Sequence, residues 1–158
     1  HLFFDIFYLC DELIRCRFEE ASDAPLRIAL MFATMLQAAG LDDNICELYG
    51  ELLSLHSSAE RQVQHLAGWL RANLRSELEE RSDSEVFARA LAVIGVLRGL
   101  LANRYYQQRL PLDMLTRVMI ESSFAILDIA PGRAAAVAVQ VEKMQGELVQ
   151  IASELAFC

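Results

Sequence analysis

The sequence has few of the residues that interrupt helices, with seven glycines and three prolines among 158 residues. The glycines are scattered, so there is no glycine-rich loop of the kind that cradles a phosphate group. No apolar run reaches the roughly 18 residues that a membrane-spanning helix needs. No segment keeps the sustained alternation that marks a strand. These absences argue against a phosphate-loop protein and against membrane insertion, and they favour an all-α fold.

Recognisable metal and catalytic motifs are also missing. The four cysteines contain no C-x-x-C pair, and no Glu-x-x-His spacing suits a di-iron bundle. His56 is followed by Ser57 and Ser58, but no strained turn is present to expose a nucleophile. We therefore expect no metal, no cofactor and no enzymatic activity. Cys10 and Cys46 are expected to be buried thiols of a protein in the reducing cytoplasm.

Positive charge is scarce, and Lys143 is the only lysine beside thirteen arginines. Acidic residues outnumber basic ones by 22 to 14, which gives a net charge of −8. Such a chain is repelled by a polyanion, so we do not expect it to bind DNA by itself. The hydrophobic fraction of 54% exceeds the roughly 45–50% of ordinary soluble domains. The excess indicates a large core, a pocket or a subunit interface.

Apolar periodicity predicts about seven helices in one domain over residues 1–158. The expected ranges are roughly 2–20, 25–40, 43–56, 57–80, 84–107, 111–130 and 130–157. Gly40 is expected to end the second helix. Capping-box spacing at Ser57 with Glu60, and at Ser82 with Glu85, predicts two further helix starts.

One helix face in the middle of the chain combines polar and aromatic side chains. His65, Trp69 and Asn73 are spaced at i, i+4 and i+8, so they share one face of the expected fourth helix. Buried polar groups need partners, and such a row either bonds within the core, points to water, or lines a cavity. The last interpretation predicts a ligand site whose further residues are Phe32, Met35, Tyr49 and Phe87.

Two glycines lie inside the expected fifth helix, although glycine there costs about 1 kcal/mol relative to alanine. Because they are four residues apart on one face, they predict a close contact with another helix. We expect a two-fold homodimer through the fifth and sixth helices. The expected interface residues are Gly95, Val96, Gly99, Leu100, Leu115, Val118, Met119 and Ser122.

Several segments, in order, resemble the ligand-binding domains of the tetracycline-repressor (TetR) family of transcription regulators. HLFFDIFYLCDELIRCRFEE is similar to the helix that connects the DNA-binding head to this domain. SDAPLRIALMFATML and DDNICELYGELL are similar to the next two helices, and AERQVQHLAGWLRANLRSELEE is similar to the long helix that lines the ligand cavity. AVIGVLRGLL followed by LPLDMLTRVMIESSFAIL is similar to the dimerisation pair. The resemblance covers roughly residues 3–129.

The resemblance implies an effector-binding and dimerisation domain that senses a small, largely apolar or aromatic molecule. DNA would be bound only through a helix-turn-helix that precedes His1. An effector that favours one arrangement of the helices would change the spacing of the DNA-binding heads. The alternative is a helical adaptor that binds another protein's helix, and an enzyme with a site in the bundle core is a third reading.

Overall fold

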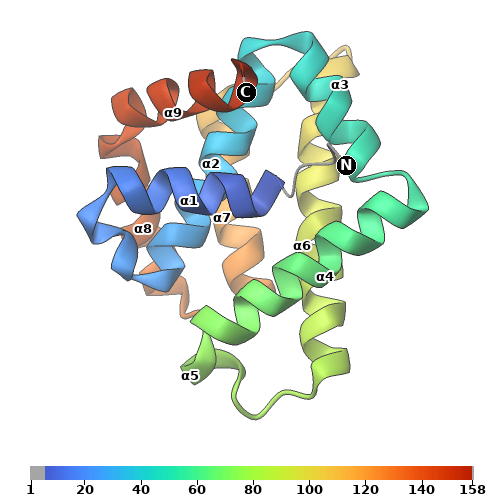
Figure 1. Cartoon of the computed structure of the whole chain (residues 1–158). Coiled ribbons are helices and arrows are strands. Elements are labelled where there is room, and N and C mark those ends of the chain that lie inside the picture. Colours follow the sequence, from blue (N-terminus) through green and yellow to red (C-terminus); the bar gives the residue numbers. More distant parts are fainter. Residues whose placement is uncertain (1–5, 158) are drawn as a thin grey trace.

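The computed structural model describes residues 6–157 of the chain. Within this range the chain forms nine α-helices, two short 3-10 helices and no strand, which confirms the all-α bundle (Figure 1). The helices are α1 (Ile6–Arg17), α2 (Ala24–Leu41), α3 (Asp43–Leu52), α4 (His56–Asn73), α5 (Arg75–Leu78), α6 (Asp83–Ala102), α7 (Leu112–Ile126), α8 (Pro131–Lys143) and α9 (Gln145–Phe157). The 3-10 turns are η1 (Glu19–Ser22) and η2 (Asn103–Tyr105).

Helix α2 lies at the centre of the bundle, and thirteen of its eighteen residues are buried. Helices α1, α3, α7, α8 and α9 pack around it (Figure 1). By length and composition α2 is apolar enough to cross a membrane, but 72% of it is buried inside the fold. Its apolar character is therefore explained by its position as the core helix.

Helices α4 and α6 pack against each other, and α6 also packs against α7. The buried hydrophobic residues of all these helices join in one continuous cluster. Two of them, Phe7 of α1 and Phe32 of α2, meet edge to face with their ring centroids 6.3 Å apart. The buried thiols of Cys10 and Cys46 belong to the same cluster, which confirms the expectation that both are core thiols.

One of the two expected capping boxes forms. The Ser82 hydroxyl accepts a hydrogen bond from the Glu85 amide at 3.2 Å, and the Glu85 carboxylate accepts one from the Ser82 amide at 2.9 Å. At the other position the N-cap of α4 is Leu55, two residues before the expected Ser57, and it makes no side-chain cap. Ser57 is thus already inside the helix.

The expected long helices are interrupted at two places. Helix α4 ends at Asn73 instead of continuing to residue 80, and the short α5 follows it. The Arg71 guanidinium donates hydrogen bonds to the carbonyl oxygens of Leu78 and Arg81, which holds the chain after the break. The expected last helix is divided at Met144 into α8 and α9, which lets α9 turn back over α2 (Figure 1).

Gly40 does not end α2. The helix continues to Leu41, and no glycine of the described residues has a positive φ. The Arg104 guanidinium donates hydrogen bonds to the carbonyl oxygens of Ala39 and Gly40 at 3.0 and 3.3 Å. The end of α2 is therefore satisfied by a side chain from η2 and not by a glycine cap.

Candidate functional site

The row of polar and aromatic residues on α4 divides into two environments. Trp69 and Asn73 are half-buried against the bundle, whereas His65 lies at the exposed surface of the helix. The Asn73 side-chain NH2 donates to the Trp69 carbonyl at 2.8 Å, and its oxygen accepts from the Arg27 guanidinium. The Asn73 amide is therefore used within the fold.

Arg27 of α2 is the centre of this cluster. Its guanidinium lies over the Trp69 ring, 4.9 Å from the ring centroid, in a cation–π contact. Its Nε lies 2.8 Å from the Asp11 carboxylate of α1, and both side chains are only 12% exposed. A charge buried to this extent requires an opposite charge. The cluster therefore joins α1, α2 and α4 at one point.

Arg27 and Asp11 were not identified from the sequence, although each gives a local signal. Asp11 lies on the apolar face of α1, next to Cys10 and four residues after Phe7. Arg27 is the one charged residue of α2. A single charge within an apolar helical segment indicates a buried partner, but the partner lies far away in the sequence.

Two buried polar atoms on the inner side of α4 have no hydrogen-bond partner among the described residues. These are Nε1 of Trp69 and Oε1 of Gln62, and Gln62 is only 1% exposed. The two residues are seven positions apart, which places them on one face of the helix, about 10 Å apart along its axis. Unsatisfied buried polar atoms are uncommon in folded proteins. The fold therefore leaves the hydrogen-bonding capacity of these two atoms unused.

The other expected ligand residues lie in or beside the core. Phe32 and Met35 of α2 are fully buried, Tyr49 of α3 is 3% exposed, and Phe87 of α6 is half-buried. Burial, and to a smaller extent the neighbouring Cys10, raises the pKa of the Tyr49 hydroxyl far above its usual range. Tyr49 is therefore neutral at physiological pH.

The expected dimer helices, α6 and α7, are neighbours with a shared outward face. Gly95 and Gly99 are exposed, and a Cβ atom built at either position would meet no atom within 4 Å. These glycines are consequently not required by packing within the chain. The other expected interface residues lie beside the two glycines along the line where α6 meets α7, which we call the dimer seam. They are half-buried or partly exposed, namely Val96, Leu100, Leu115, Val118 and Ser122. Met119 is fully buried and lies inside the chain instead of on this face.

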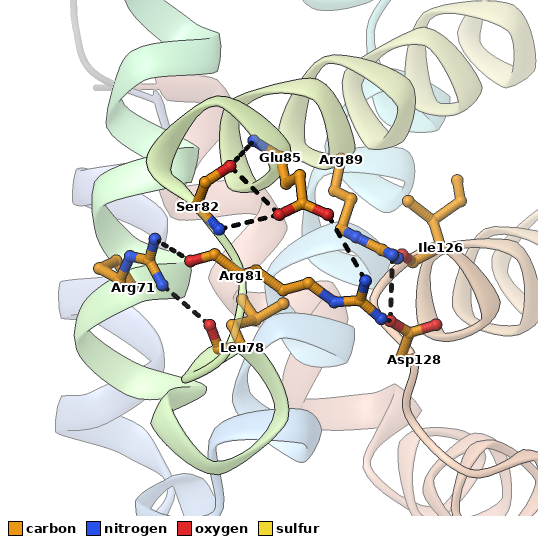
Figure 2. A network of polar contacts seen from close by, with 8 residues as sticks. All are labelled: Arg71, Leu78, Arg81, Ser82, Glu85, Arg89, Ile126 and Asp128. Carbon is orange, nitrogen blue, oxygen red and sulfur yellow. Dashed lines mark hydrogen bonds and ion pairs between the residues drawn. The ribbon is translucent and has the colours of Figure 1, made fainter.

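A network of arginines and carboxylates holds the first turn of α6 (Figure 2). Arg81 and Arg89 both contact the Asp128 carboxylate, at 2.8 and 3.1 Å. Arg89 also donates to the Ile126 carbonyl, and Arg81 lies 3.5 Å from Glu85. The network ties the start of α6 to the end of α7.

Asp128 is the one non-glycine residue with positive φ in the described chain, with φ of 59°. The Ile129 amide donates to the Phe124 carbonyl at 2.9 Å, and the Asp128 amide donates to the Ala125 carbonyl at 3.3 Å. This is the pattern of a Schellman helix end, where glycine usually occupies the left-handed position. The two arginine contacts explain why an aspartate stands there.

At the other end of α6 lies a recess between α2, α3, η2 and the start of α7, with a volume of about 200 Å³. It opens beside a shallower recess of about 850 Å³ along α3, and the two share Cys46, Leu101, Arg104 and Arg109. None of the expected ligand residues lines either recess, but Leu100 and Leu115 of the expected dimer seam line the smaller one. No three metal-binding side chains come together anywhere in residues 6–157.

No known protein family, curated protein or solved structure matches the chain. The TetR resemblance consequently rests on the sequence segments alone.

Proposed function

We propose that the chain is the effector-binding and dimerisation domain of a TetR-like transcription regulator that works in the cytoplasm. The outward face of α6 and α7 is the observation that supports this proposal best. Small and apolar side chains lie along it on both helices, and Gly95 and Gly99 leave room for a close approach. An apolar face of this kind is stabilised when a second copy covers it, and two-fold symmetry pairs the face with itself.

The proposed effector is a small, largely apolar or aromatic molecule that binds on the inner side of α4. The unpartnered Trp69 Nε1 and Gln62 Oε1 support this position, because a ligand with one acceptor and one donor would satisfy both. Helix α4 packs against both α1 and α6. A ligand that moves α4 would therefore act on the dimer helix and on α1, which in this proposal leads to a DNA-binding head before His1.

Self-association is tested first, by light scattering of the protein at micromolar concentration. We expect a dimer, and we expect Gly99→Arg to convert it to a monomer because the long charged side chain would enter the interface. Gly68→Arg on α4 is the matched control, since Gly68 is also an exposed helical glycine with no atom within 4 Å of a built Cβ. It should leave the dimer intact.

Two results would contradict dimerisation through α6 and α7. One is a monomeric wild-type protein, which would favour the helical adaptor, with the same apolar face binding another protein's helix. The other is a dimer that Gly99→Arg and Gly68→Arg affect equally.

The effector site is tested with 2-naphthol, an aromatic probe whose single hydroxyl group can accept a hydrogen bond from Nε1 of Trp69. At a hundred times its dissociation constant a ligand stabilises the folded state by about 2.7 kcal/mol, which raises the melting temperature clearly. We expect Trp69→Ala to abolish this rise while the dimer persists. Val139→Ala, which shortens an exposed apolar residue of α8, should preserve it. A rise that survives Trp69→Ala would contradict the proposed position of the site.

A further inference from the structure

The small recess at the end of α6 is enclosed mainly by hydrocarbon. Seven alanine and leucine side chains from three segments line it, namely Leu36, Ala39, Leu100, Leu101, Leu110, Leu112 and Leu115. Its volume of about 200 Å³ is below the roughly 300–1,000 Å³ of pockets for drug-sized ligands. An occupant of this recess therefore has to be a small molecule.

The walls of the recess are fixed by two side chains of η2. The Asn103 NH2 group donates to the Gln108 carbonyl at 3.0 Å, and its oxygen accepts from the Leu110 amide at 2.8 Å. Arg104 binds the carbonyl oxygens at the end of α2 and pairs with Asp43. The connection between α6 and α7 and the end of α2 are thus held apart around a preformed space.

Arg109 differs from Arg104, although both line the recess. Arg104 is engaged by carbonyl oxygens and by Asp43, whereas no hydrogen bond or ion pair among the described residues involves Arg109. It also borders the adjoining shallow recess. An unpaired guanidinium at the mouth of an apolar recess is placed to bind an anion, and its planar fork matches a carboxylate.

We propose that this recess binds a small carboxylic acid, with the hydrocarbon part among the leucines and the carboxylate on Arg109. The inference goes beyond the proposed function, because the recess is separate from the inner face of α4. Ala39, which lines the recess, follows Arg27 of the α4 cluster by twelve residues along α2. This corresponds to about 18 Å along the helix axis. A ligand here would contact Leu100 and Leu115, and so would act on the seam between α6 and α7.

Hexanoate is the probe for this site, with 1-hexanol as the uncharged equivalent and acetate as the carboxylate without a tail. Binding is followed in methyl spectra of the full chain labelled at leucine. A ligand of this size is expected to bind with a millimolar dissociation constant. We expect hexanoate to shift the methyl signals of Leu110 and Leu112, hexanol to bind about tenfold more weakly, and acetate not to saturate.

Two variants test the charge of Arg109 and the space in the recess separately, and a third serves as the control. Arg109→Gln should weaken hexanoate about tenfold, to the level of hexanol, and leave hexanol unchanged. Arg61→Gln removes an exposed arginine of α4 and should change neither. Gly40→Leu should block both ligands, because a Cβ at Gly40 lies 3.9 Å from Leu112 and a longer side chain enters the recess. Its melting temperature should not fall, since Gly40 lies inside a helix without positive φ.

Equal affinity for hexanoate and hexanol in the wild-type protein would overturn the proposal. So would unchanged hexanoate binding in Arg109→Gln or in Gly40→Leu, shifts confined to leucines outside the recess, or no binding at millimolar concentration. Dimerisation and the naphthol site are measured separately, so failure of this site is distinguishable from failure of the proposed function.

Discussion

The two ends of α6 are held in different ways. At the first turn, charged side chains satisfy one another, and two arginines converge on Asp128 (Figure 2). At the last turn, Asn103 and Arg104 bond mainly to backbone groups, and Arg109 stays unpaired beside an apolar space. The difference separates a closed structural network, in which each charge has several partners, from an end of the helix that can still accept a ligand.

The largest effect is expected at the recess end, where one side chain holds the connection between α6 and α7. Asn103→Ala removes two hydrogen bonds to backbone groups, at Gln108 and Leu110. We expect a loss of about 2 kcal/mol in the free energy of unfolding, at about 1 kcal/mol for each bond. Urea denaturation measures it, with Asn44→Ala as the control because Asn44 is exposed and bonds through its backbone amide. Equal stability of the two variants would show that the connection is held by other contacts.

The start of α6, where the arginine–carboxylate network lies, should tolerate the loss of Asp128 better, because Arg81 and Arg89 each have a second partner. Asp128→Ala removes both arginine contacts and leaves a non-glycine residue at φ 59°, so we expect a loss of about 1–2 kcal/mol. Asp128→Gly also removes the contacts but suits the left-handed conformation. It should be about 1 kcal/mol more stable than Asp128→Ala in the same urea experiment. If alanine and glycine behave alike, the backbone conformation at this position contributes nothing.

The smallest effect is the pH dependence of the network. The amide and hydroxyl of Ser82, and then Arg81, lower the pKa of Glu85 below its usual value. A carboxyl with a lowered pKa in the folded state stabilises the fold above its unfolded value of about 4.3, and this contribution is lost as the pH falls through the folded pKa. Glu85→Gln should therefore show a weaker fall in the urea midpoint between about pH 6 and pH 3 than the wild-type chain. Parallel curves for the two proteins would rule out this contribution.

Helix positions were predictable from the sequence wherever local signals decide them. The apolar period located the helical segments, Ser82 with Glu85 marked the start of α6, and Pro111 preceded α7. The breaks at Leu74 and Met144 were not predicted. The first depends on Arg71 reaching carbonyl groups that come later in the chain, and the second places α9 over α2.

The candidate sites show the same difference between features that local sequence decides and features that depend on distant residues. Spacing on one helix grouped Trp69 with Asn73, and the structure brings both to Arg27. The partnership itself could not be predicted, because Arg27 and Asn73 are 46 positions apart. The recess is less predictable still, since its walls come from segments between residues 36 and 115 that carry no shared motif.

The return of α9 over α2 has a consequence for how the protein is made. Leu148, Ile151, Ala152 and Leu155 of α9 are buried, and α2 is the helix that α9 packs against most extensively. During synthesis, therefore, the most apolar helix of the bundle leaves the ribosome more than a hundred residues before its cover does. At about 5–20 residues per second this interval lasts several seconds, during which the surface of α2 that α9 covers is exposed to chaperones and to other nascent chains. A chain stopped before residue 145 would keep that surface uncovered permanently.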